Sequence, residues 1–124
     1  MPMPLQADPT QLAAQRRLLA ELKPNAPAPL ASVLDRIGHA FVEIGQEGAP
    51  LDRIRARAFE GPGGNWKVSR FGAYGIPWVG VEWPTGANRV LTDWLFQAMH
   101  DCRLATDRPG VPGNQLWFYC GAGR

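Results

Sequence analysis

The chain alternates polar and apolar residues on both sides of a glycine-rich turn, and this pattern constrains the fold more than any other. The segments RIRARAF, residues 53–59, and WKVSRF, residues 66–71, are separated by GPGGN. Successive side chains of a strand point to opposite faces, so alternation predicts two strands that each bury one face. Because Gly and Pro favour a tight turn between them, we expect a β-hairpin.

A third strand is expected directly after the hairpin. IPWVGVEW, residues 76–83, is rich in β-branched and aromatic residues, and Pro77 stands at its beginning, where a strand tolerates the missing N–H. QLWFYCG near the end of the chain predicts a closing strand at 116–120. These segments predict a small, mostly antiparallel sheet.

Two helices are expected before the strands. The first follows Asp8, a favourable N-cap, has Pro9 in its first turn and ends at Pro24. After the proline-rich connector PNAPAP, the second helix is expected over about 30–46. Its apolar face consists of Leu30, Val33, Leu34, Ile37, Phe41 and Ile44. Small residues recur beside that face at a spacing of seven, which favours close packing by another element: Ala31, Gly38 and Gly45.

TGANRVLTDWLFQAMHDCRLAT, residues 85–106, has the strongest helical pattern of the chain. Its wide apolar face consists of Val90, Leu91, Trp94, Leu95, Ala98, Met99 and Cys102. We therefore predict an α+β fold: N-terminal helices, a small mostly antiparallel sheet and a long amphipathic helix packed on it. Residues 1–8 are expected to form a flexible N-terminus and residues 9–124 a single domain.

Composition narrows the class of protein without naming a function. The chain is 45% hydrophobic with a net charge of +2, which are values of a globular protein and neither require nor exclude a polyanionic partner. No apolar stretch approaches the length of a membrane span, and the first residues lack the pattern of a secretory signal. We expect a cytoplasmic protein with no membrane association. Cys102 and Cys120 are then expected to be reduced thiols.

Trp78 is the first candidate contact residue. In the third strand Val79, Val81 and Trp83 point to one face, which is the natural core face, and Trp78 points to the other beside Gly80. An exposed tryptophan next to glycine would suit an anchor for a ligand or partner. The alternative is that a helix covers this face too and that Trp78 belongs to the core.

A row of basic residues is the second candidate. Arg53, Arg55 and Arg57 share one face if RIRAR is a strand, and Lys67 is expected across the hairpin from them. Such a row suits phosphates or an acidic protein surface, whereas solvated charge on an edge strand is the common alternative. If residues 51–58 instead form a short helix with Leu51, Ile54 and Ala58 on one side, the row breaks up.

Phe96 is the third candidate. On a helical projection it falls in the middle of the polar face, flanked by Arg89, His100 and Arg103. A large apolar residue ringed by basic ones resembles the centre of a protein interface. The alternative is that the N-terminal segment or the first helix packs there.

Catalytic and metal-binding patterns are weak. Asp35, His39 and Glu43 follow one another at i, i+4 and i+8, a spacing that could orient a general base but is far more often a solvated helix face. His100, Cys102 and Cys120 lack the close pairing of zinc ligands. We therefore expect no metal, no cofactor and no enzymatic activity.

These observations favour a small non-catalytic domain that binds a larger protein, as an inhibitor, an adaptor or a subunit. The alternative is a nucleic-acid-binding protein with Trp78 or Tyr74 stacking on bases and a basic strand face formed by Arg53, Arg55, Arg57, Lys67 and Arg70. The sequence leaves the partner and the oligomeric state open.

Overall fold

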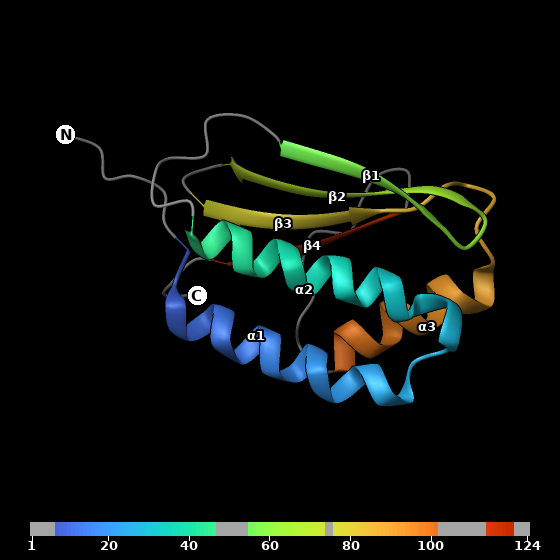
Figure 1. Cartoon of the computed structure of the whole chain (residues 1–124), viewed down its shortest axis with the longest axis horizontal. Helices are drawn as coiled ribbons and strands as arrows, with labels where there is room; N and C mark the ends of the chain where they lie inside the picture. The colour runs from blue at the N-terminus through green and yellow to red at the C-terminus, as the bar shows by residue number, and fades with distance from the viewer. Residues whose placement is uncertain (1–6, 47–54, 74–75, 102–113, 121–124) are drawn as a thin grey trace.

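The computed structural model describes residues 7–46, 55–73, 76–101 and 114–120 (Figure 1). Within these ranges the fold is α+β, as the sequence predicted. The elements in chain order are α1 (Pro9–Leu22), two 3₁₀ turns (Lys23–Asn25 and Ala28–Leu30), α2 (Ala31–Gln46), β1 (Arg55–Gly61), β2 (Gly64–Ala73), β3 (Ile76–Glu82), α3 (Arg89–Asp101) and β4 (Gln115–Tyr119). The four strands form an antiparallel sheet in the order β1-β2-β3-β4.

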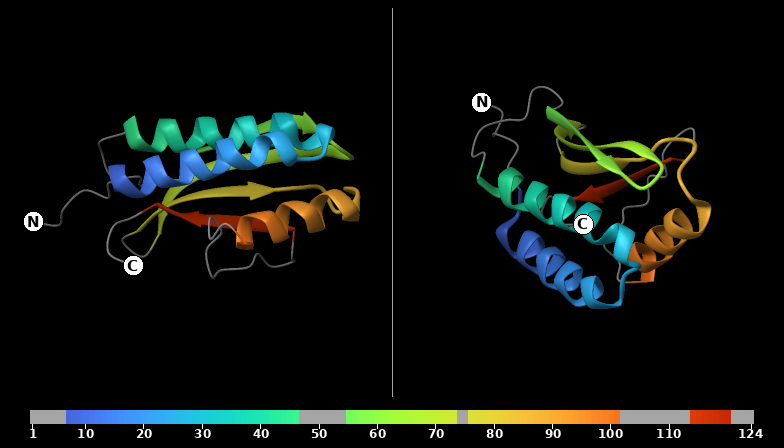
Figure 2. Two further views of the ribbon diagram at one scale, coloured as in Figure 1. Left: turned by 90° about the horizontal axis from the view of Figure 1, so that it is seen from below. Right: turned by 45° about the vertical axis from the view of Figure 1, so that its right-hand side comes forward.

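The molecule has two layers, with α1, α2 and α3 all on one face of the sheet (Figure 2). α2 crosses beneath β2 and β3 in the middle of the sheet. Between the layers lies one apolar core, in which Phe41 of α2 meets Phe118 of β4 edge to face at a centroid distance of 5.4 Å. The helix facing the centre of the sheet is therefore α2, whereas α3 reaches the core through Leu95 and Met99.

The start of α1 is fixed by its capping residue. The Asp8 carboxylate accepts a hydrogen bond from the Gln11 amide at 2.9 Å, and the Asp8 amide donates to the Cys120 carbonyl at 2.8 Å. Ala7 packs against the core. Within the segment predicted to be flexible at 1–8, Ala7 and Asp8 thus contact the end of β4 and the core. Residues 1–6 lie outside the described ranges, and the flexibility of this segment stays a prediction.

The small residues of α2 explain how closely α1 approaches. A β-carbon on Gly38 would lie 3.3 Å from Cδ2 of Leu19, and one on Gly45 would lie 2.9 Å from Cδ1 of Leu12. The expectation that the glycines admit a neighbouring element is thus confirmed, and that element is α1.

The hairpin predicted from the alternation is present. β1 and β2 pair from Arg55 opposite Arg70 to Gly61 opposite Gly64, around a two-residue turn. Gly63 in that turn has φ +85°, a left-handed conformation that glycine adopts without steric cost. The Trp66 indole donates to the Pro62 carbonyl at 3.0 Å and so closes the turn from the core side.

α3 begins after Asn88, whose side-chain oxygen accepts a hydrogen bond from the Val90 amide at 2.9 Å. The sequence placed Val90 on the apolar face, but its side chain is 76% exposed because it lies in the first turn, where the capped end of the helix faces solvent. Cys102 lies outside the described residues. No helix in the described part of the chain is both long and apolar enough to cross a membrane.

Candidate binding surfaces

Phe96 lines a cleft between α3 and the end of β3. Phe96 is 38% exposed, and its ring meets that of the buried Trp83 edge to face, with centroids 6.5 Å apart. Asn114 fixes this end of the strand, because its side-chain amide donates to the Trp83 carbonyl at 2.7 Å. The cleft has a volume of about 330 Å³ and is here called the Phe96 cleft; its lining residues are Trp83, Pro84, Thr85, Ala87, Arg89, Thr92, Asp93, Phe96 and Asn114.

The rim of the Phe96 cleft is polar. Arg89 and Asp93, one turn apart on α3, form an exposed ion pair at 3.8 Å. Of the basic residues predicted around Phe96, Arg89 therefore lines the cleft. His100 is exposed one turn further along α3 but does not line it, and Arg103 lies outside the described residues. The cleft thus combines an aromatic floor with a small, mixed-charge rim.

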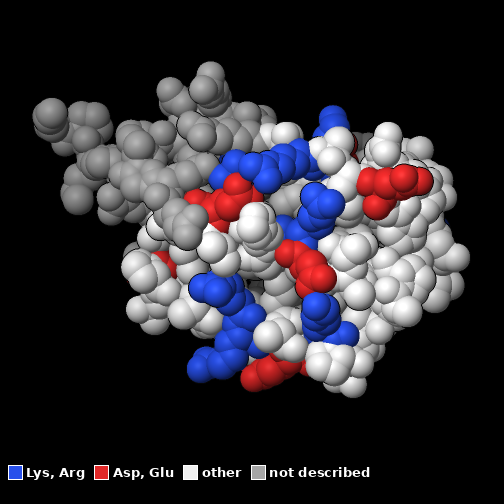
Figure 3. Space-filling view, viewed as in Figure 1, with Lys and Arg blue, Asp and Glu red and all other residues white. Residues whose placement is uncertain are grey.

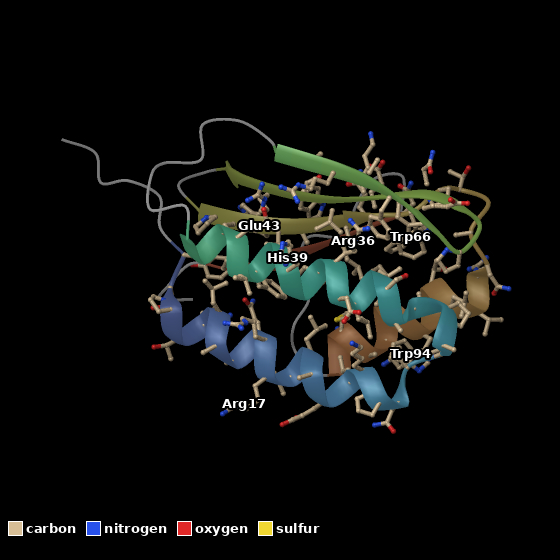
Figure 4. All side chains as sticks on the ribbon, viewed as in Figure 1. Arg17, Arg36, His39, Glu43, Trp66 and Trp94 are labelled. Carbon is tan, nitrogen blue, oxygen red and sulfur yellow. The ribbon has the colours of Figure 1, made fainter. Side chains whose placement is uncertain are left out.

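A second surface lies between α2 and the hairpin, where one carboxylate meets several basic side chains. Glu43 Oε2 lies 3.3 Å from a terminal nitrogen of Arg70 and 3.4 Å from one of Arg57, while Oε1 lies 3.7 Å from Nε2 of His39. Figure 4 shows His39 and Glu43 on the side of α2 that is turned toward the strands. The small cavity here, about 30 Å³ in volume, is called the Glu43 groove; its lining residues are Arg36, His39, Ala40, Glu43, Arg57, Phe59, Val68 and Arg70.

Strand register and helical spacing together build the Glu43 groove. Arg57 pairs with Val68 and Phe59 with Trp66, so these side chains share the face of the hairpin that looks onto α2. From α2, the guanidinium carbon of Arg36 lies 5.1 Å above the centre of the Phe59 ring, a cation–π contact. Viewed from this side, basic and acidic side chains are interspersed over α2 and the hairpin (Figure 3).

The predicted basic row is only partly assembled. Arg57 faces α2, but Lys67 pairs with Ala58 and therefore points to the opposite face of the sheet. The expectation that Lys67 lies across from the arginines is wrong, because the two-residue turn fixes a register in which Val68 occupies that position. Arg53 lies outside the described residues, as does the side chain of Arg55, the first residue of β1.

Trp78 does not stand exposed on the outer face of the sheet. It points away from α2 but is only 7% exposed, and its ring meets Tyr119 edge to face at 5.9 Å. The space that Gly80 leaves beside it, having no side chain, is occupied by the ring of Trp117 on β4. Trp78 therefore belongs to an aromatic layer on the outer face, and the half-buried members of that layer are Trp117 and Tyr119. Tyr74 lies outside the described residues.

Asp35, His39 and Glu43 do not form one cluster, because Asp35 and Glu43 contact different parts of the chain. Asp35 pairs with Lys23 at 2.6 Å, whereas Glu43 turns to the hairpin arginines. The described residues hold no group of three or more His, Cys, Asp or Glu side chains that could bind a metal ion. Cys120 is buried, and burial raises the pKa of its thiol to about 12, an effect partly offset by a backbone hydrogen bond from Val79.

The sequence drew attention to Phe96 but not to the convergence of Glu43 and Arg70. His39 and Glu43 at i, i+4 were visible as a helical pair, yet their partners on the hairpin depend on strand register. Comparisons of the chain with protein-family models, with curated proteins and with solved structures find no match. Function is therefore inferred from the surfaces of the described residues.

Proposed function

We propose that the chain is a small non-catalytic protein-binding domain, acting as an inhibitor, adaptor or subunit, and that the Phe96 cleft contacts the partner. The observation that carries this proposal is the exposure of Phe96 on a helix whose neighbouring apolar residues, Leu95 and Met99, are fully buried. Burying a large apolar side chain is favourable by about 1.5–3 kcal/mol. A partner that covers Phe96 would gain part of this free energy.

The composition of the cleft fits the centre of a protein interface better than a catalytic pocket. Aromatic residues are enriched at energetically important interface positions and are typically surrounded by a polar rim. Here Trp83 and Phe96 provide the aromatic floor, and the Arg89–Asp93 pair provides the rim. We infer that the partner inserts an apolar side chain beside Phe96 and that polar groups of the partner meet the rim.

The test compares three baits: the wild type, Phe96→Ser and Val90→Ser. Val90 is the matched control because it is an exposed apolar residue on the same helix that does not line the cleft. Each purified protein is incubated with nuclease-treated lysate of the source organism, and captured proteins are quantified by mass spectrometry after thermal melts show that all three baits are folded.

We expect one stoichiometric protein that binds the wild type and Val90→Ser and is depleted at least about tenfold on Phe96→Ser, as for an interface hot spot. Equal capture by all three baits would reject the Phe96 cleft as the contact site. Absence of any stoichiometric protein from the wild-type sample would count against the protein-binding function itself.

Nucleic-acid binding is the second candidate, and the outer face of the sheet favours it. Trp117 and Tyr119 are half-buried there, and Lys67 is exposed on the same face. Arg57 and Arg70 face α2 instead, so this candidate rests on fewer basic residues than the sequence suggested. Each phosphate contact to a single strand would lower the affinity about 2.6-fold between about 50 and 200 mM salt. Fluorescence anisotropy with a labelled oligonucleotide measures this, and an affinity independent of salt would reject it.

A further inference from the structure

The charges that line the Glu43 groove do not balance. Three arginines, Arg36, Arg57 and Arg70, face a single carboxylate, which leaves a net charge of +2 among the Arg, Lys, Asp and Glu side chains of the described lining residues. Basic side chains on a protein surface normally spread apart, because like charges repel one another. Here α2 and the hairpin hold them around one cavity, so the groove is electrostatically suited to a multivalent anion.

The contacts of Glu43 leave donor capacity on Arg57. A single oxygen, Oε2, is shared by Arg57 and Arg70 at 3.4 and 3.3 Å. Both distances exceed the range of about 2.7–2.9 Å typical of a charge-assisted hydrogen bond. A guanidinium has five N–H donors, so the longer contact to Glu43 does not use up the donors of Arg57, whose side chain is mostly exposed.

The groove also has a fixed base. The Arg70 side chain is only 10% exposed, and the neighbouring wall consists of Ala40, Phe59 and Val68. An apolar wall lowers the local dielectric constant and strengthens the attraction between a guanidinium and an anion. The volume of about 30 Å³ accommodates one or two oxygen atoms but not a base or sugar ring, so the remaining oxygens of a larger anion would lie on the solvent side, where Arg36 and Arg57 are exposed.

We propose that the Glu43 groove binds a phosphate monoester group, with Arg57 and Arg36 as the ligands reached from solvent and Arg70 as the buried anchor. A phosphate monoester carries a charge of about −1.5 to −2 at neutral pH, which matches the net +2 of the groove. A carboxylate ligand would carry only about half of that charge, and the groove already contains the carboxylate of Glu43. The fork of an arginine also matches the spacing of phosphoryl oxygens. This site is separate from the Phe96 cleft and does not rest on the proposed function.

The test uses inorganic phosphate and phenyl phosphate as probes, with acetate and chloride at matched ionic strength as controls. Binding to the full chain is followed by isothermal titration calorimetry and by amide NMR shifts of α2 and the hairpin. Arg57→Gln and Arg36→Gln each remove one charge from the groove. Arg89→Gln removes one charge from an exposed site outside it and is the matched control.

We expect phosphate and phenyl phosphate to bind, and each groove variant to lose at least about tenfold in affinity, while Arg89→Gln stays within about twofold. Arg57→Lys keeps the charge but loses the fork of the guanidinium, so its affinity for phosphate should lie between those of Arg57→Gln and Arg89→Gln. Glu43→Gln removes the competing carboxylate, so the affinity for phosphate should rise several-fold.

Three results would overturn the proposal. The first is a response to phosphate no larger than the response to chloride. The second is an equal loss in Arg57→Gln and Arg89→Gln, which would mean general surface attraction. The third is that an oligonucleotide without terminal phosphates binds more tightly than phenyl phosphate and that Arg57→Gln weakens its binding. This result would assign the groove to phosphodiester backbones. Because every readout uses purified chain and a defined anion, these results are independent of whether the Phe96 cleft captures a protein.

Discussion

The indole ring of Trp117 lies across Gly80, its direct partner on the neighbouring strand. A β-carbon at position 80 would overlap the six-membered part of that ring. Beside this pair, Trp78 and Tyr119 meet edge to face with ring planes at 86°. The absence of a side chain at Gly80 thus lets β3 and β4 build a compact aromatic layer on the face of the sheet opposite α2.

We therefore expect Gly80→Ala to lower the free energy of unfolding by about 1–3 kcal/mol, the usual effect of overpacking a close contact. Urea denaturation followed by tryptophan fluorescence measures this change. Gly86→Ala is the matched control, since nothing lies within 4 Å of the β-carbon it would add, and it should stay within about 0.5 kcal/mol of the wild type. Equal stability of the two variants would show that Trp117 does not depend on the gap at Gly80.

Local patterns predicted most of the elements correctly. The cap at Asp8, the apolar periodicity of α2 and the alternation on either side of the turn at Gly63 each act over a few residues. These signals arise from local backbone geometry, which is the same whichever element packs against the segment. The helices and the hairpin could therefore be predicted without knowledge of their partners in space.

The positions of individual side chains depended on non-local pairing, and here the sequence was less informative. Lys67 faces away from Arg57 because the register at the hairpin turn sets which residue pairs with which. Trp78 is buried partly against Tyr119. The two residues are 41 positions apart along the chain and become neighbours only because β3 pairs with β4. Likewise, Glu43 meets Arg57 and Arg70 only because α2 lies beneath the hairpin.

The ion pairs of Glu43 should contribute more to stability than the exposed pair of α3. Glu43 is 20% exposed and Arg70 only 10%, so removing the carboxylate takes a charged partner from a largely buried guanidinium. We expect Glu43→Gln to cost about 1–3 kcal/mol. Asp93→Asn breaks the exposed Arg89–Asp93 pair and should cost less than about 0.5 kcal/mol. Chemical denaturation at a single pH compares the two variants, and similar costs would mean that the Glu43 contacts are solvated.

Burial of Cys120 predicts an alkaline limit to stability. The pKa of its thiol is raised from an ordinary value of 9.0 to about 12, so the folded protein keeps the proton while the unfolded chain loses it between these values. The stabilising contribution is fully present below pH 9.0 and is lost as the pH rises toward about 12. One such group lowers the free energy of unfolding by about 1.4 kcal/mol per pH unit in this window.

The measurement compares the slopes of stability against pH for the wild type and Cys120→Ala. The alanine variant has no thiol at this position, so its stability should fall less steeply above pH 9.0, whatever constant offset the smaller side chain introduces. Parallel slopes for the two proteins would show that the thiol does not remain protonated in the folded state.

The turn of the hairpin gives the last prediction. Gly63 has φ +85°, and a β-carbon there would lie 2.8 Å from the backbone Cα of Ala87, which cannot rotate away. Both the left-handed conformation and the contact oppose a side chain, so Gly63→Ala should cost about 1–3 kcal/mol.

Gly38→Ala is the contrasting variant, because its β-carbon would meet only the end of the flexible Leu19 side chain at 3.3 Å. There the gain in helix propensity, about 1 kcal/mol, offsets the tighter contact, and the variant should be no less stable than the wild type. Thermal melts of both variants test the contrast, and hydrogen exchange in β1 and β2 should accelerate only in Gly63→Ala. If Gly63→Ala had the same melting temperature as the wild type, the turn and its contact with Ala87 would relax without cost.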